Sequence, residues 1–179
     1  MGFKDIEIKS SYETGEDDLV KDFYVPVLFN AVRYDRIAGF FSSTSLAVAA
    51  RGIVGFLDKG ERMRMLVCPK LNKEDVEILR LAEENPTYYL EEYFPRDIEI
   101  SEDLFEQQHV NALGWLLAKG ILEIRVAFVY KDGHLCLENE GIFHQKIGIA
   151  YDEEGNVISF SGSINESANG WLNNVEEFK

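Results

Sequence analysis

This sequence has few cysteines, no long apolar run and no group of metal-binding side chains at ligand spacing. Its two cysteines, Cys68 and Cys136, do not make a disulfide framework, and their spacing does not support a metal site. No apolar segment is long enough to span a bilayer. We therefore expect reduced thiols and a cytoplasmic location. A length of 179 residues with 46% hydrophobic content suits one compact domain with a sizeable core.

Basic residues are also scarce, which limits how the chain could bind a polyanion. The 18 Lys and Arg against 32 Asp and Glu give a net charge of −14, which argues against nonspecific coating of nucleic acid. Between residues 72 and 107, twelve acidic side chains accompany only three basic ones. The first 70 residues hold ten basic side chains, so the sequence still allows a local basic rim that binds a phosphate backbone. The plainer interpretation is that most of these are solvated surface charges.

Hydrophobic periodicity predicts helices and strands that alternate along the chain. A strand over 35–41, a helix over 46–57 and a strand over 62–68 favour a parallel, right-handed crossover pair. The order indicates an α/β domain with a mixed, largely parallel sheet flanked by helices on both faces. We expect further helices over 17–32 (interrupted at Pro26), 73–84 and 103–119, and further strands over 121–130, 143–151, 157–163 and 174–178.

Two features of the middle of the chain have alternative interpretations. Residues 87–102 fit either a loop or a broken helix, and their aromatic side chains could stack on bases. An aromatic patch beside an acidic run more often covers a core. His109, inside the predicted helix 103–119, is expected to be structural.

Polar side chains of several kinds gather in residues 143–178. If 143–151 is a strand, alternation puts His144 and Lys146 on one face, followed there by two small residues that leave room for a ligand. Residues 157–163 read as the returning strand of a hairpin. Pairing the apolar faces of the two strands would place the serine hydroxyls of 159–163 beside His144 and Lys146.

This pattern resembles the half-site motif of the phospholipase D superfamily, which is His-x-Lys, a downstream Asp, and Gly-Ser-x-Asn. The nuclease branch of that superfamily also carries Asn-x-Glu after the motif. The Asp of this chain falls one residue later than in the commonest spacing. The resemblance implies the phospholipase D/nuclease fold, and the matching residues are His144, Lys146, Asp152, Gly162, Ser163, Asn165 and, in the Asn-x-Glu, Asn174 and Glu176.

The resemblance also implies a role for each matched side chain. His144 would attack phosphorus to form a phosphohistidine, and Lys146 would bind the nonbridging oxygens. Ser163 and Asn165 would donate hydrogen bonds to the same oxygens, and Glu176 would hold one ring nitrogen of His144. This chemistry needs no metal and no cofactor. His144 and Asp152 alone provide too few ligands for a zinc site.

The sequence contains no second His-x-Lys before residue 142, and no internal repeat. The superfamily builds its active site from two copies of the motif. One copy per chain therefore implies a homodimer that pairs two hairpins across a two-fold axis.

The resemblance also narrows the substrate. Residues 34–52 resemble the start of phospholipase D-like nuclease modules at the N-termini of prokaryotic helicases and restriction-type proteins. Because Lys179 falls within the predicted last strand, we expect residues 1–179 to be one such domain from a longer chain, with a helicase following. The expected function is a metal-independent endonuclease acting on nucleic acid, with DNA favoured. The alternatives are a noncatalytic DNA-binding and dimerisation module and, more distantly, a lipid phosphodiesterase.

Overall fold

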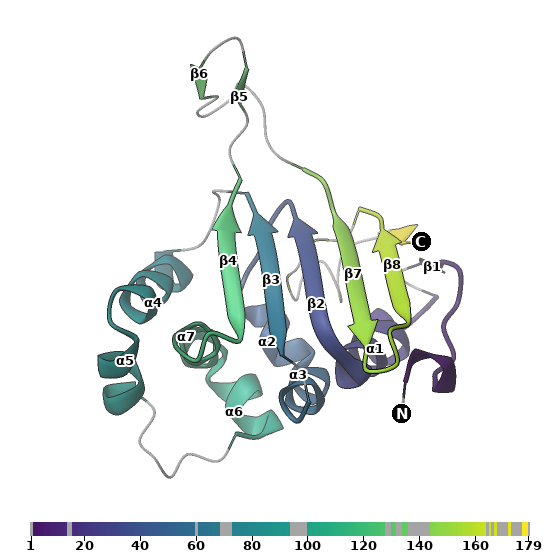
Figure 1. The fold of residues 1–179 in the computed structure, drawn as a ribbon. Helices are drawn as coiled ribbons and strands as arrows, with labels where there is room; N and C mark the ends of the chain where they lie inside the picture. Colours follow the sequence, from purple (N-terminus) through teal and green to yellow (C-terminus); the bar gives the residue numbers. More distant parts are fainter. Residues whose placement is uncertain are drawn as a thin grey trace.

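The protein is built around a five-stranded sheet with the strand order β4-β3-β2-β7-β8 (Figure 1). The computed structural model describes residues 2–13, 16–59, 61–68, 73–93, 100–127, 130–131, 134–135, 144–163, 165, 167, 172 and 177–178. The sheet strands are β2 (Ala31–Ala38), β3 (Arg62–Val67), β4 (Leu122–Val126), β7 (Ile147–Asp152) and β8 (Val157–Ser161). Two pairs of two-residue strands complete the description: β1 (Tyr12–Glu13) with β9 (Glu177–Phe178), and β5 (Tyr130–Lys131) with β6 (His134–Leu135).

Strands β2, β3 and β4 run parallel, while β7 is antiparallel to β2 and to β8. The predicted α/β class, the mixed sheet and the parallel pair joined through a helical crossover are therefore confirmed. The helices are η2 (a π-helix, Val20–Tyr24), α1 (Val25–Asn30), α2 (Thr44–Val48), α3 (Ala50–Leu57), α4 (Lys73–Glu84), α5 (Pro86–Tyr93), α6 (Glu102–Gln107) and α7 (His109–Ala118), with a short 3-10 turn at Phe3–Asp5.

Three predicted helices are irregular or divided. Pro26 lies in the first turn of α1, where the π-helix η2 changes to an α-helix while Tyr24 and Val25 keep helical geometry, so the predicted helix changes type near Pro26 but is not broken there. Ala49 separates α2 from α3, and Gln108 leaves helical geometry at φ −129° between α6 and α7. The side chain of Ser101 caps α6 by accepting a hydrogen bond from Leu104 N at 3.4 Å.

The described helices lie on one face of the sheet, behind it in Figure 1. Strand residues on that face, including Tyr34, Met63 and Val67, are buried, whereas Arg33, Arg62 and their neighbours on the other face are exposed to varying degrees. The expected cover of helices on both faces is therefore wrong for the part of the chain that the structure describes. Only one face carries a continuous apolar surface that helices could bury.

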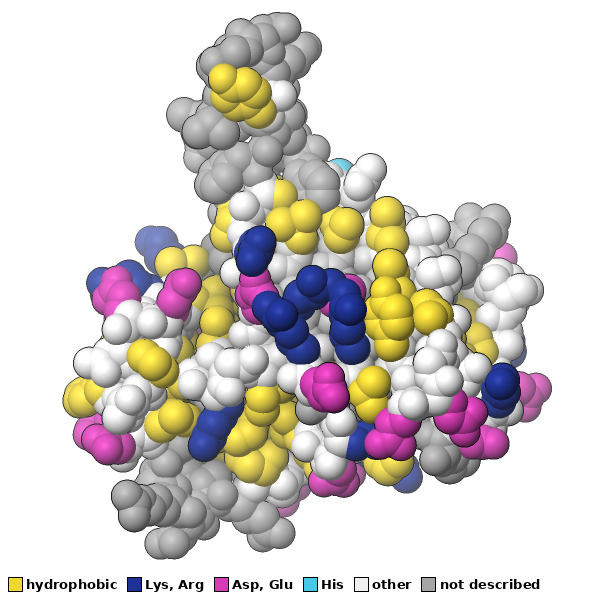
Figure 2. Space-filling model, in the orientation of Figure 1, with side chains coloured by type: hydrophobic (Ala, Val, Ile, Leu, Met, Phe, Trp, Pro, Cys, Tyr) yellow, Lys and Arg dark blue, Asp and Glu magenta, His cyan; other side chains and the backbone are white. Residues whose placement is uncertain are grey.

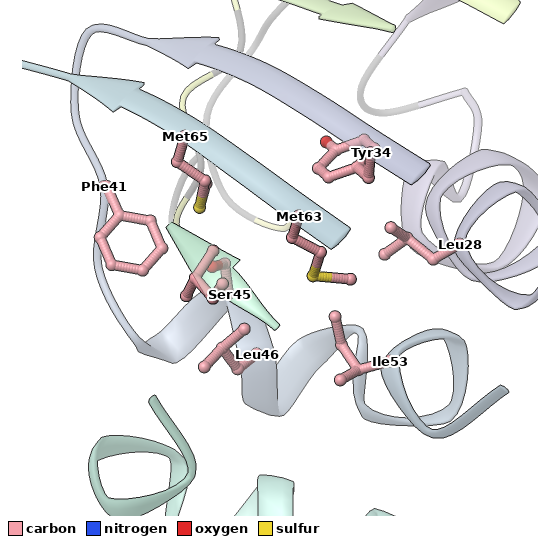
Figure 3. A pocket seen from close by; sticks show the side chains of 9 residues that line it. Leu28, Tyr34, Phe41, Ser45, Leu46, Ile53, Met63 and Met65 are labelled. Atoms are coloured by element: carbon pink, nitrogen blue, oxygen red, sulfur yellow. The ribbon is translucent and has the colours of Figure 1, made fainter. Parts of the chain in front are cut away.

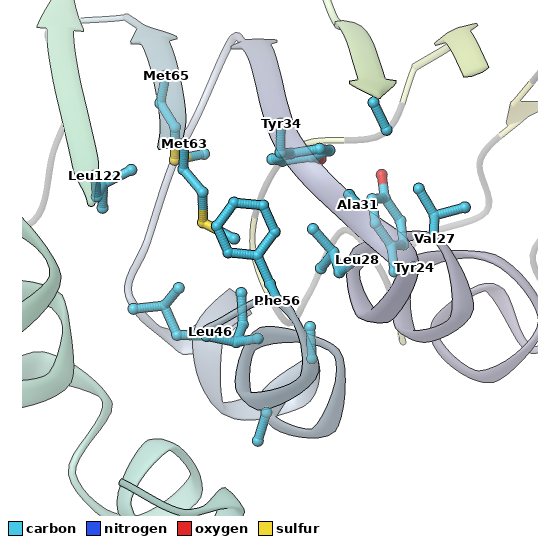
Figure 4. Close-up of a cluster of buried hydrophobic side chains, with 14 of the residues drawn as sticks. Tyr24, Val27, Leu28, Ala31, Tyr34, Leu46, Phe56, Met63, Met65 and Leu122 are labelled. Carbon is cyan, nitrogen blue, oxygen red and sulfur yellow. The ribbon is translucent and has the colours of Figure 1, made fainter. Parts of the chain in front are cut away.

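The core fills the space between the sheet and the helices. Figure 4 shows Phe56 of α3 packed beneath Met63 and Met65, with Leu28 and Tyr34 on one side. A cavity of about 20 Å³ remains between these elements, and its lining is almost wholly apolar (Figure 3). It has room for roughly one water molecule. It is a packing defect and not a substrate site.

Part of the aromatic cluster also belongs to a core. Tyr89 in α5 is fully buried, its hydroxyl donates to the backbone oxygen of Asn111, and its ring lies directly over Gly114. Tyr89 therefore covers a small core, as the plainer interpretation expected, while Tyr88 is exposed. None of the described helices is long and apolar enough to cross a membrane.

Candidate functional site

The His144-x-Lys146 motif lies just before β7, beside the carboxyl end of β2. The register pairs Ile147 with Ile37, so the residues that precede β7 reach the turn that follows β2. Lys146 is 4% exposed, whereas His144 is exposed. The backbone N–H of Gly162 donates to the Lys146 carbonyl at 3.3 Å. The β7–β8 hairpin therefore brings the His-x-Lys and Gly-Ser parts of the motif to the same end of the sheet.

Lys146 and His144 are in direct contact. The Lys146 ammonium lies 3.0 Å from His144 Nε2 and donates to the His144 carbonyl at 3.1 Å. A lysine ammonium has three donors and no acceptor, so this contact places a hydrogen-bond donor against a ring nitrogen of His144. The histidine and the lysine of the motif are therefore adjacent side chains.

Gly39, one residue after β2, brings a third group into this site. A Cβ atom on Gly39 would lie 3.1 Å from His144 Cδ2, 3.3 Å from Lys146 Nζ and 3.3 Å from Asn165 Oδ1. Three side chains from two separate segments therefore surround one backbone position. Sequence reasoning did not include Gly39. The only signal was a glycine at the end of a predicted strand, which often marks a close approach of the backbone to another group.

Asn165 has an unusual environment. Its Oδ1 atom is buried and has no hydrogen-bond partner among the described residues. A buried polar atom without a partner costs about 1–3 kcal/mol, so its presence calls for an explanation such as a bound water, ion or ligand. Of the other predicted site residues, Ser163 is exposed and directly follows Gly162, whose N–H is bonded to Lys146. Glu176 and Asn174 lie outside the described residues.

The pairing of the hairpin differs from the prediction. Ile147 lies opposite Ser161 and Gly148 lies opposite Phe160, so Ser159 and Ser161 share a face with Ile147 and Ile149. The predicted placement of these two hydroxyls beside Lys146 is wrong. The small residues after Lys146 do not leave room for a ligand either, because a Cβ on Gly148 would overlap the Phe160 ring. Burial of that ring decides which face of the hairpin points inward.

Asp152 does not join the site. It lies at the opposite end of β7 from Lys146, and six residues of strand span roughly 20 Å. Its buried carboxylate accepts hydrogen bonds from Phe3 N (2.7 Å), Glu154 N (3.0 Å) and Asn156 N and Nδ2 (2.7 and 2.8 Å). Asp152 closes the turn between β7 and β8 and fastens the N-terminal segment to it.

The environment of Asp152 predicts a pH dependence of stability. Burial alone would raise the pKa of the Asp152 carboxyl, but hydrogen bonds from Asn156, Phe3 and Glu154 outweigh it and lower the pKa. A carboxyl with a depressed folded-state pKa contributes stability that is present above its unfolded pKa of about 3.9 and is lost as the pH falls through the folded value.

We therefore expect Asp152→Asn to lower the free energy of unfolding at pH 7 by about 2–3 kcal/mol, because a charged acceptor of several buried donors is lost. At a pH near 2 the difference from wild type should shrink. Urea unfolding at both pH values measures this. Asp5→Asn is a matched control, since Asp5 is exposed and, among the described residues, accepts a hydrogen bond from Gly2 N alone. If Asp152→Asn lowered the free energy of unfolding equally at pH 7 and near pH 2, this explanation would be contradicted.

His109 has a structural contact, as expected. Its Nδ1 lies 2.9 Å from Oγ of Ser43, which is buried, and the Ser43 N–H donates to the carboxylate of Asp75, which is also buried. These bonds join α7 and α4 to the segment that enters α2. Within the described residues, no group of three or more His, Cys, Asp or Glu side chains is placed to hold a metal ion.

Comparison with solved structures identifies the fold. The chain is similar to NucT from Helicobacter pylori (TM-score 0.48, 16% identity, 94% of this chain and 81% of that one). It is also similar to two structures of yeast tyrosyl-DNA phosphodiesterase, which it matches at 9% identity. A mutant form gives a TM-score of 0.50 over 94% of this chain, and another structure gives 0.46 over 84%.

The chain spans about 25–29% of the length of the yeast enzyme's chains. No protein-family model and no curated protein sequence matches this sequence. At identities this low, structural similarity shows the fold alone. The match at a TM-score of 0.50, together with the sheet order, confirms the fold that the sequence resemblance implied: the chain has a phospholipase D-like α/β fold.

Proposed function

We propose that this protein is a cytoplasmic, metal-independent phosphodiesterase that cleaves nucleic acid, most readily DNA, in a site shared by two copies of the chain. The observation that carries the proposal is the convergence of His144, Lys146 and Asn165 around Gly39. A phosphodiester resists attack because its oxygens are anionic, so a catalyst must supply both a nucleophile and positive charge. In this site His144 would supply the nucleophile and Lys146 the positive charge, and the two side chains are 3.0 Å apart.

The geometry supports a specific first step. The His144 Nε2 lone pair attacks phosphorus and forms an N–P bond, while the bond from phosphorus to the leaving oxygen breaks. Lys146 is 3.0 Å from the attacking nitrogen, close enough to neutralise the nonbridging oxygens as charge develops on them. The Asn165 amide lies across Gly39 from Lys146, where its NH₂ could donate to the same oxygens and Ser163 could assist.

The second half of the reaction needs a proton donor and then water. The partner subunit's His144 would give its proton to the leaving oxygen. Water would then lose a proton to that same deprotonated histidine as it attacks phosphorus, and the N–P bond would break with its electron pair returning to the nitrogen of the first His144. Because Lys146 contacts Nε2, the remaining ring nitrogen, Nδ1, is the one that Glu176 would hold. The mechanism needs two histidines, a nucleophile and a proton donor, and each chain has one His-x-Lys motif. This supports a homodimer, whose mass in solution would be twice 20.4 kDa.

Two observations support nucleic acid as the substrate. The yeast enzyme with the same fold is, by its name, a phosphodiesterase of DNA. Cleavage of a polymer also suits a histidine that is exposed, in the segment just before β7. A helicase attached after this domain, as the resemblance of residues 34–52 implies, would present such a polymer.

The test is cleavage of supercoiled plasmid by the wild-type chain in excess chelator, followed by covalent trapping. An internally ³²P-labelled oligonucleotide is mixed with the protein and quenched in alkali with detergent. We expect plasmid nicking without added metal, and label that migrates with the protein and is released by mild acid, as a phosphohistidine requires.

Cleavage that needs added metal would overturn the mechanism. DNA affinity without turnover and without trapped label would instead indicate a noncatalytic binding module. A protein that sediments only as a monomer yet cleaves at full rate would contradict the shared site.

A further inference from the structure

The face of the sheet that no described helix covers carries an ordered set of arginines. Asp35 on β2 is bracketed by Arg33, at 2.6 Å, and by Arg64 of β3, whose Nε and Nη2 both donate to it at 2.7 Å. Glu123 on β4 is bracketed in the same way by Arg125, at 2.6 Å, and by Arg62. Arg64 lies opposite both Asp35 and Glu123 in the sheet register, so the two groups adjoin. We call these six residues the arginine face.

The guanidinium groups are the outermost charges of the arginine face. The side chains of Arg33, Arg64, Arg62 and Arg125 are 42%, 44%, 52% and 76% exposed, whereas those of Asp35 and Glu123 are 17% and 27% exposed. The two carboxylates hold four arginines in place from below. The face thus has an excess of positive charge on a chain with a net charge of −14 (Figure 2). Arginines already held in position lose little further entropy when they bind an anion.

An apolar strip continues the same face along β7 and reaches β8 at Val157. Ile147, Ile149 and Tyr151 follow one another on β7 beside β2, and Val157 lies opposite Tyr151. Ile147 and Val157 are 37% and 54% exposed, and Ser159 and Ser161 fill the rest of this face of β8. Arg33 lies 4.8 Å from the centre of the Tyr151 ring and joins the two halves. Figure 2 shows this strip as the yellow column beside the dark blue cluster.

This combination favours one class of partner. A second copy of the chain docked by two-fold symmetry would place one arginine face against the other, which like charges oppose. A duplex offers phosphates but keeps its bases stacked inside, so it would leave the apolar strip unused. A single strand exposes phosphates and base faces side by side, and proteins bind it through positive charge combined with aromatic and apolar surface.

We propose that the open face of the sheet binds single-stranded nucleic acid, with phosphates over the arginine face and bases over the strip from Ile147 to Val157. The proposal rests on the proposed function for the identity of the polyanion. It deepens that function by assigning a surface, separate from the His144 site, that holds the strand.

The experiment measures binding of a fluorescent oligothymidylate 20-mer to the full chain by anisotropy, from low to moderate salt. All proteins carry His144→Ala, so that cleavage cannot remove the probe. The test variant adds R62Q and R125Q, the two most exposed arginines of the face. The control adds R51Q and R80Q, which make the same change in net charge on the exposed sides of α3 and α4.

We expect the R62Q/R125Q protein to bind about tenfold or more weakly at low salt. Its slope of log affinity against log salt should fall by about 1.4, since each phosphate contact of a single strand contributes about 0.7. The control should match its parent, and a duplex of equal length should bind more weakly than the single strand. Thermal unfolding of each protein verifies that it is folded.

Equal weakening in both double variants, or in neither, would overturn the proposal. So would duplex binding as tight as that of the single strand, or an R62Q/R125Q effect on self-association instead of on oligonucleotide affinity. Failure of the nuclease proposal is seen separately, as an absence of cleavage and of trapped label in the otherwise wild-type chain. These binding data do not depend on that result.

Discussion

Replacement of His144 by alanine is expected to lower the rate of DNA cleavage by about 10⁴-fold or more, to the background of contaminating activity. In the shared site that we propose, the variant loses both the nucleophile and the proton donor, because each subunit contributes one of the two histidines. The expected loss of cleavage rate therefore exceeds the loss from replacing a residue whose only role is to stabilise charge. Initial rates of oligonucleotide cleavage in excess chelator measure it.

The structure also predicts that this variant folds normally. The His144 side chain is exposed, and its hydrogen-bond contact is with Lys146. Its unfolding midpoint should stay within a few degrees of wild type. His134→Ala in β6 is the matched control and should cleave at the wild-type rate. Equal activity of the His144→Ala and wild-type proteins would remove the catalytic assignment altogether.

Replacement of Lys146 by methionine is expected to lower kcat by about 10²–10³-fold, the range seen when one group that stabilises transition-state charge is removed. Methionine is similar in length and apolar, so it can occupy a site that is only 4% exposed. The Nε2 atom of His144 loses its contact at the same time, so nucleophile orientation and charge neutralisation both suffer. Kinetics on a short oligonucleotide separate kcat from KM.

The control for this variant is Lys21→Met, which removes one positive charge from an exposed position on η2. It should leave kcat unchanged and affect KM only slightly. If Lys146→Met raised KM with kcat intact, Lys146 would serve ground-state binding and not the transition state. Loss of the folded state in Lys146→Met would show instead that the buried lysine is structural.

Local periodicity was sufficient for most of the regular elements. The helix predicted over 73–84 is α4, and the strand predicted over 62–68 is β3 less one residue, because each carries a strong pattern bounded by clear stop signals. The single helices predicted over 46–57 and 103–119 are each divided in two. Their breaks, at Ala49 and Gln108, have no proline or glycine to mark them.

The motif could also be found from the sequence, but the residues that surround it in the folded protein could not. Spacing alone suggested that Asp152 belongs with His144, yet the structure commits it to the far end of the hairpin. Gly39 is more than 100 positions from His144 and became part of the site only when β2 paired with β7. Glu176 remains a sequence prediction.

The sequence by itself determined the α/β class, most of the elements and the set of candidate site residues, since these follow from patterns within a few residues of one another. Only the tertiary structure decided which face of the hairpin is buried, which glycine meets the motif side chains, and that six charged residues and an apolar strip share the open face of the sheet. Alternation states which residues share a face but not which face turns inward. That choice depended on the Phe160 ring packing over Gly148 against residues from distant segments, among them Phe23 at 5.0 Å between ring centres.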